Sequence, residues 1–158
     1  MTIAENNASE ENASEVGELE KDRVVEEGFD SIPADVCIKI LREGTIGILA
    51  LIGSDAPDLR PVNFAISRKR IVMRTAHGRI FDGARREEAA SFVVTEFDHR
   101  QHSGRSIIVS GNLSVCDPTD SAIRTKVGAW SKADRPERIL LSIVKITGRQ
   151  LSDRMQAD

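Results

Sequence analysis

The chain has 158 residues, of which 40% are hydrophobic, and a formal net charge of −3 at pH 7. This length is typical of one domain with one core, and no apolar run approaches the roughly 20 residues that a membrane span needs. The chain has one tryptophan and no tyrosine. Because aromatic residues do not alternate with basic ones, as they do in proteins that stack bases, we expect no nucleic-acid binding.

The charge is unevenly distributed along the chain. Residues 1–35 carry a net charge of −9, and the remaining residues carry +6. Residues 1–22 are rich in Glu, Asn, Ser and Ala and offer little to bury, so we expect a disordered acidic leader followed by one folded domain over residues 23–158. The first residues are polar and acidic, without a basic and then apolar signal pattern, which predicts a cytoplasmic protein.

The cysteines and histidines do not complete a disulfide framework or a metal site. Cys37 and Cys116 are far apart in the sequence, and each follows apolar residues, so we expect two buried free thiols. His99 and His102 follow Asp98 at an H-x-x-H spacing, but no further ligands are near in the sequence. We interpret this segment as a solvated loop and predict no metal.

The pattern of apolar residues predicts a mainly β (α+β) domain. Ser31 and Pro33 are typical of a helix start, and Gly44 of its end. Further helices are expected over residues 78–90 and 117–127. Six strands are predicted, over residues 45–52, 59–66, 71–75, 91–97, 105–115 and 138–146. Short turns between consecutive strands indicate an antiparallel sheet, and six strands in a chain of this size favour closure into a barrel.

One cluster of residues suits an anionic ligand. Arg74 and Thr75 end the third predicted strand, and Gly78 and Arg79 follow at the predicted helix start. Guanidinium groups bind phosphate oxygens with two parallel hydrogen bonds, and backbone N–H groups at a helix start favour an anion. The cluster therefore suggests a site for a phosphate monoester, and an ordinary exposed basic turn remains the alternative. No nucleophile–base motif is present, so the catalytic residues are unknown.

Motifs in the same order resemble those of the pyridoxamine 5′-phosphate oxidase-like family of flavin-binding split β-barrels. They cover about residues 35–151. The matching pieces are Leu41-Arg42-Glu43-Gly44, Gly47-Ile48-Leu49-Ala50, Arg60-Pro61-Val62-Asn63-Phe64, Arg74-Thr75 with Gly78-Arg79, the run from Gly104 to Gly111, and Ile146-Thr147-Gly148-Arg149. The resemblance implies a six-stranded antiparallel split β-barrel with short flanking helices.

The resemblance also implies roles for particular residues. The backbone of Pro61, Val62 and Asn63 would line the isoalloxazine ring of FMN, and Ser106 would lie near the flavin. The ribityl phosphate would contact Arg74 and Thr75. Next to Gly78, Arg79 would occupy the position where relatives often carry a phosphate-binding lysine.

The function that the resemblance implies is that of an FMN-binding flavoprotein. We expect an oxidoreductase of unassigned substrate, with the cofactor held at a homodimer interface. We do not expect its reaction to be the oxidation of vitamin B6. Two alternatives stay open: a deazaflavin-dependent reductase of the same fold, and a non-catalytic flavin-binding or regulatory protein. In an FMN-dependent oxidoreductase or a deazaflavin-dependent reductase, the cofactor carries the redox chemistry. This would explain why no acid–base pair is evident in the sequence.

Overall fold

The computed structural model describes residues 29–151, so the acidic leader expected over residues 1–22 lies outside the described residues. The strands are β1 (Asp30–Ile32), β2 (Ile46–Leu51), β3 (Asp58–Ser67), β4 (Arg70–Thr75), β5 (Ala89–Asp98), β6 (Ser103–Val115), β7 (Glu137–Ser142) and β8 (Lys145–Leu151). The helices are α2 (Ala34–Glu43), α3 (Arg79–Arg85) and the 3₁₀ helix η1 (Ser121–Arg124). In the described part of the chain, no helix is long and apolar enough to span a membrane.

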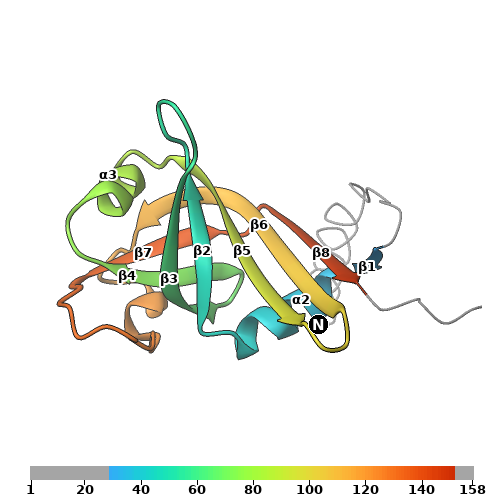
Figure 1. The fold of residues 1–158 in the computed structure, drawn as a ribbon. Helices are drawn as coiled ribbons and strands as arrows, with labels where there is room; N and C mark the ends of the chain where they lie inside the picture. The colour runs from blue at the N-terminus through green and yellow to red at the C-terminus, as the bar shows by residue number, and fades with distance from the viewer. Residues whose placement is uncertain (1–28, 152–158) are drawn as a thin grey trace, which may run out of the picture.

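Strands β2 to β7 form a closed antiparallel barrel in the order β6-β5-β2-β3-β4-β7 and back to β6 (Figure 1). Closure depends on β6, which is the longest strand. One of its edges pairs with β5 from Ser103 to Asn112. The other edge pairs with β8 from Gly104 to Ser110 and then with β7 from Leu113 to Val115. The predicted six-stranded barrel is confirmed, and β8 and β1 extend the sheet beyond it.

The change of partner along β6 requires a glycine. At Gly111 the backbone of β6 passes directly over the end of β7, where a Cβ atom would lie 1.7 Å from the carbonyl oxygen of Ser142. The Ser142 hydroxyl also accepts a hydrogen bond from the Asn112 N–H, at 3.1 Å. The pairing of β5 with β6 runs through Gly111 without interruption, so β6 has no bulge on that edge.

Three predicted elements differ from the structure. The strand expected over residues 138–146 is two strands, β7 and β8, because the chain turns at residues 143–144. The helix expected over 78–90 ends at Arg85, and Ala89 and Ala90 belong to β5. The helix expected over 117–127 is only the one turn of η1. There the side chains of Asp117 and Asp120 accept hydrogen bonds from nearby backbone N–H groups, which competes with helix formation. The short strand β1 was not predicted.

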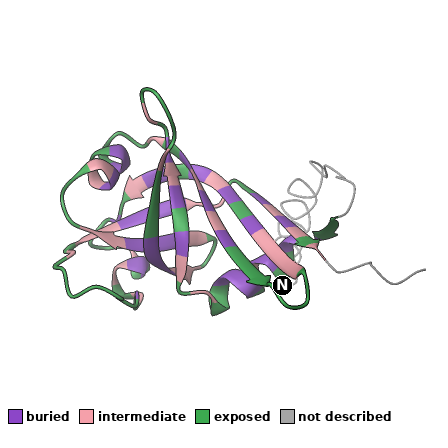
Figure 2. Ribbon diagram, in the orientation of Figure 1, coloured by how far each residue is buried: buried purple, intermediate pink, exposed green. Residues whose placement is uncertain are grey.

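Two clusters of buried apolar side chains stabilise the barrel, and Figure 2 shows the buried residues distributed along its strands. The larger one fills the interior, where the rings of Phe64 and Phe92 meet edge to face with centroids 4.9 Å apart. The smaller one lies on the opposite face of β4 and β7, around Val72 and Leu140, and the segment 116–136 covers it. Its Cys116, like Cys37 in the larger cluster, is a buried free thiol, as predicted. Burial raises the pKa of the Cys37 thiol to about 11.

Replacing Gly111 with alanine should destabilise the barrel. The added Cβ would overlap the Ser142 carbonyl, so β6 and β7 would have to separate, and we expect a loss of about 2 kcal/mol or more in the free energy of unfolding. Urea unfolding measures this value. The control is Gly128→Ala, where an added Cβ meets nothing within 4 Å. Equal stability of the two variants would contradict the crossing at Gly111.

Candidate functional site

The outer face of β2, β3, β5 and β6 carries an apolar row that the segment 116–136 does not cover. Alternation along each strand places Leu49 and Val109 in the barrel interior, so their neighbours point outward. The row runs through Pro61, Ile48, Val93 and Ile108, which the strand registers place side by side. Ile48 and Ile108 are each 38% exposed. Pro61, which we predicted to line a flavin ring, therefore lies at one end of an outward-facing apolar row.

A groove of about 610 Å³ adjoins this row, under the turn between β2 and β3. Its floor is made of small side chains, since Ala50, Ser91 and Ser110 lie side by side in the next outward row. The hydroxyl oxygens of Ser91 and Ser110 are 3.2 Å apart. Ile52 and Val144 form apolar walls, and both are well exposed. The volume lies in the range of small-molecule sites.

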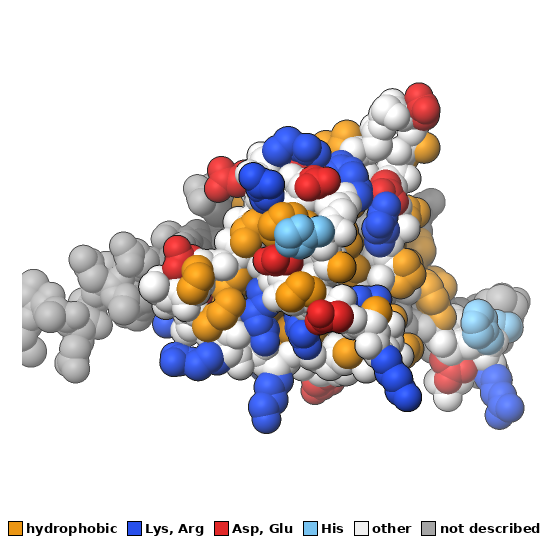
Figure 3. All heavy atoms as spheres, turned by 90° about the vertical axis from the view of Figure 1, so that its left-hand side faces the viewer, with side chains coloured by type: hydrophobic (Ala, Val, Ile, Leu, Met, Phe, Trp, Pro, Cys, Tyr) orange, Lys and Arg blue, Asp and Glu red, His pale blue; other side chains and the backbone are white. Residues whose placement is uncertain are grey.

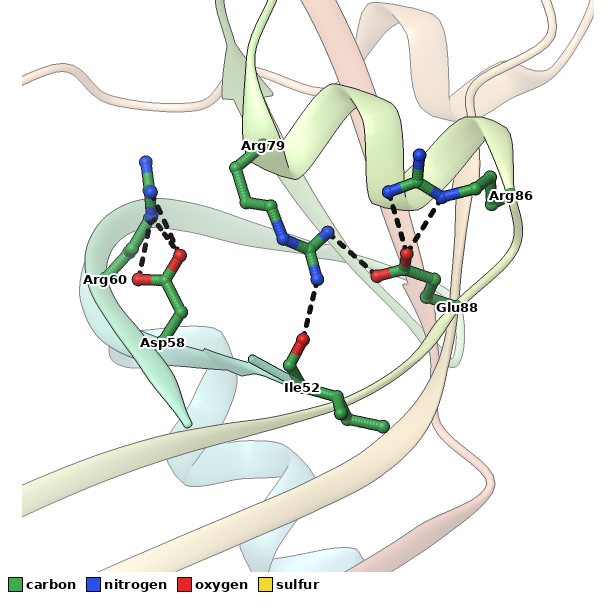
Figure 4. A network of polar contacts seen from close by, with 6 residues as sticks. All are labelled: Ile52, Asp58, Arg60, Arg79, Arg86 and Glu88. Atoms are coloured by element: carbon green, nitrogen blue, oxygen red, sulfur yellow. Dashed lines mark hydrogen bonds and ion pairs between the residues drawn. The ribbon is translucent and has the colours of Figure 1, made fainter. Parts of the chain in front are cut away.

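Arg79, at the start of α3, makes two polar contacts that hold its guanidinium group (Figure 4). One terminal nitrogen lies 2.8 Å from Oε2 of Glu88, and the other donates to the carbonyl oxygen of Ile52 at 2.9 Å. Arg79 therefore connects α3 to Ile52, the residue after β2, and to Glu88, the residue before β5. It borders the groove through Ile52, but its charge is already paired.

The neighbouring arginines are paired with carboxylates as well. Arg60 contacts both carboxylate oxygens of Asp58, at 3.0 and 3.1 Å, and Arg86 contacts Oε1 of Glu88 at 3.0 Å. The Arg79 and Arg86 guanidinium groups lower the pKa of Glu88, and a hydrogen bond from Arg60 lowers that of Asp58. On the side of the molecule that carries α3, basic and acidic side chains are accordingly mixed instead of forming a patch of one sign (Figure 3).

Arg74 and Thr75 are adjacent in β4 but project to opposite faces of the strand. The Nε of Arg74 donates to the carbonyl oxygen of Arg135 at 3.0 Å, so this side chain points toward the covering segment 116–136. The Thr75 hydroxyl donates to the Ala76 carbonyl at 3.1 Å. Gly78 has a φ of 156° and a ψ of −157°, a combination that essentially only glycine adopts. Among the described residues, Arg74 and Arg79 share no hydrogen-bonding partner.

The remaining predicted residues belong to β3 and β6. The side chain of Val62 packs in the barrel interior, so only its backbone could face a ligand. Asn63 is buried, and its side chain donates to the Thr45 carbonyl at 3.3 Å and accepts from the Trp130 N–H at 3.1 Å. Ser106 is half-buried on the same outward face as Ile108, between β5 and β8.

Sequence reasoning missed the groove and the contact between Glu88 and Arg79. The small residues of the groove floor come from three separate strands, and Ala89 and Ala90 had been assigned to a helix. Glu88 meets Arg79 only because the chain reverses after α3, at Glu87, whose φ is 54°. A single sequence does not reveal which non-glycine residue adopts a positive φ, so the contact between Arg79 and Glu88 could not be predicted from it.

Comparison with known proteins gives the family. The family model of pyridoxamine 5′-phosphate oxidase matches residues 33–153, so the chain belongs to this family. No curated protein matches the chain.

Several solved structures share the fold. A FAD-binding protein of Mesorhizobium loti is 19% identical with a TM-score of 0.67, covering 79% of this chain and 98% of its own. The FAD binding protein of Mycobacterium smegmatis is 20% identical with a TM-score of 0.61, covering 78% and 98%. A conserved protein of unknown function from Corynebacterium diphtheriae is 20% identical with a TM-score of 0.65, covering 79% and 99%. At these identities the likeness establishes the fold alone.

Replacing Asn63 with alanine should release the covering segment at Trp130. The buried amide links Thr45 to Trp130, so its loss should lower the free energy of unfolding by about 1 kcal/mol. Trp130 is the only tryptophan and the chain has no tyrosine, so fluorescence during urea unfolding reports on this segment. Asn112→Ala, which removes an exposed amide, is the control. If both variants unfold like the unchanged protein, Asn63 does not anchor the segment.

Proposed function

We propose that this protein is a flavoprotein that holds FMN on the outer face of β2, β3, β5 and β6. The observation that carries the proposal is the uncovered apolar row beside the groove, in a chain that belongs to the pyridoxamine 5′-phosphate oxidase family. The names of two structures with the same fold, both FAD-binding proteins, support a flavin as the ligand. The cytoplasmic location predicted from the sequence is part of the same proposal.

The residues of this chain fit the ring of a flavin. The row from Pro61 to Ile108 offers outward-facing apolar side chains that a planar ring would cover. The backbone of Val62 and Asn63 and the side chain of Ser106 would add polar contacts at its border, since the side chains of Val62 and Asn63 are turned into the protein. Such a combination of apolar surface and few polar groups is typical of cofactor sites.

The residues for the phosphate are present, with charges already partly paired. Arg74, Thr75, Gly78 and Arg79 would hold the phosphate. Gly78, where even an added Cβ would meet nothing within 4 Å, would leave room for it beside Arg79. The terminal nitrogens of Arg74 would have to reach it from the side of the covering segment, toward which this side chain points. Arg74 would contribute nitrogens other than the Nε that it gives to Arg135. Arg79 would have to share its charge between the phosphate and Glu88.

The bound flavin would supply the redox chemistry, and the protein would supply binding, orientation and exclusion of water. We propose an oxidoreductase of unassigned substrate that works as a homodimer. A second copy would cover Ile48 and Ile108, which a monomer leaves exposed, and would enclose the groove between subunits. A deazaflavin in place of FMN remains the second candidate, because the same phosphate residues would serve it.

Purified protein should bind FMN. Titration into a fixed concentration of FMN should quench the flavin fluorescence with saturation at micromolar protein, because the ring is transferred from water to an apolar surface. Parallel titrations with FAD and a deazaflavin cofactor rank the candidates. A deazaflavin that binds much more tightly than FMN would favour the second candidate, and absence of binding by all three would overturn the proposal.

Replacing Arg74 with alanine should weaken the binding of FMN more than the binding of riboflavin, because only FMN carries the phosphate. We expect a difference of about 1–3 kcal/mol in binding free energy between the two ligands, as for a charge-assisted hydrogen bond. The control is Arg124→Ala, which removes an exposed arginine from η1. Equal losses for FMN and riboflavin would mean that Arg74 supports the fold through Arg135 and does not bind phosphate.

A further inference from the structure

Glu88 occupies a fixed position between two arginines. Its backbone is held on both sides, since its N–H donates to the Gly83 carbonyl at 3.0 Å and its carbonyl accepts from the Leu113 N–H at 2.9 Å. Its side chain places one oxygen 2.8 Å from Arg79 and the other 3.0 Å from Arg86 (Figure 4). The carboxylate therefore bridges α3 and the residue that follows it.

The Arg79–Glu88 contact is also sterically enclosed. The pair lies against Gly83, where an added Cβ would come within 2.9 Å of Arg79 and 3.0 Å of Glu88. The facing atoms, one nitrogen of Arg79 and Oε2 of Glu88, are shielded from solvent and form an ion pair at 2.8 Å that lacks the geometry of a hydrogen bond. A charge pair that excludes water is screened less than a fully exposed one, so any anion that approaches Arg79 meets the field of Glu88 at close range.

We propose that Glu88 is a specificity-determining residue that competes with the ligand phosphate for Arg79, and so lowers the preference of the site for phosphorylated over unphosphorylated flavins. This inference rests on the proposed flavin-binding function. A phosphate and the Glu88 carboxylate are both anions that seek the same guanidinium group, and each reduces the attraction for the other.

Arg86 gives the carboxylate a second partner. Because Oε1 of Glu88 is held by both Nε and a terminal nitrogen of Arg86, at 3.0 Å each, Glu88 keeps one cation when Arg79 turns to a phosphate. Arg86 thus reduces the cost of releasing Arg79. The two arginines have opposite effects in this proposal. Glu88 competes with the phosphate for Arg79, and Arg86 competes with Arg79 for Glu88.

The ionisation of Glu88 supports this competition. Both arginines lower the pKa of its carboxyl group, so it stays negatively charged at neutral pH, where a phosphate monoester is also charged.

The test compares the affinity of the purified full-length protein for FMN and for riboflavin, each measured by fluorescence quenching. Glu88→Gln keeps the size and removes the charge, and should raise the ratio of FMN to riboflavin affinity about fivefold, the scale of a partly screened ion pair. The matched control is Glu87→Gln, which removes the same charge one residue away, where no contact with Arg79 exists in the structure. We expect the control to leave the ratio near that of the unchanged protein.

A second pair of variants tests the role of Arg86 in the opposite direction. Arg86→Ala should lower the ratio, because Glu88 is then left with Arg79 alone. Arg85→Ala removes the same charge from the preceding residue and should lower it less. This pair decides the question if Glu88→Gln does not fold.

The outcomes separate the inference from the function on which it rests. If the unchanged protein binds neither FMN nor riboflavin, the proposed function fails. If it binds both, and Glu88→Gln leaves the ratio unchanged, lowers it, or matches Glu87→Gln, the role of Glu88 is overturned. If Glu88→Gln does not fold, equal ratios for Arg86→Ala and Arg85→Ala overturn it.

Discussion

The double pairing of β6 is the constraint on which the rest of the structure depends. One edge of this strand holds β5 along its length, and the other changes from β8 to β7 at Gly111. The change closes the barrel, because β7 also holds β4. The segment 116–136 covers the outer face of β4 and β7, whereas the apolar row on the outer face of β2, β3, β5 and β6 stays uncovered.

Much of this arrangement could be predicted from the sequence, because it follows from local patterns. The six barrel strands alternate or run apolar between clear turn signals, and Gly111 interrupts the longest of them. The split between β7 and β8 was missed because Ile143 and Val144 continue an apolar run through the turn. The prediction of a helix over 117–127 was wrong because the side chains of Asp117 and Asp120 accept hydrogen bonds from nearby backbone N–H groups. The spacing of apolar residues does not reveal this competition.

The candidate site was only partly predictable, since its parts meet through the fold. The arginines and glycine of the phosphate cluster are close in the sequence and could be singled out there. Their actual partners, Arg135 for Arg74 and Glu88 and Ile52 for Arg79, come from other elements. Burial of Val62 and Asn63 agrees with a role for their backbone, but whether these residues contact a flavin stays a prediction.

The central claim is that a flavin lies on the uncovered outer face of the barrel. Backbone amide chemical shifts of isotope-labelled protein, recorded with and without FMN, test it most directly. The account predicts that the perturbed amides gather at Val62, Asn63, Ser91 and Ser106 and around Gly78. Shifts confined to the segment 116–136, or no shifts at saturating FMN, would contradict it.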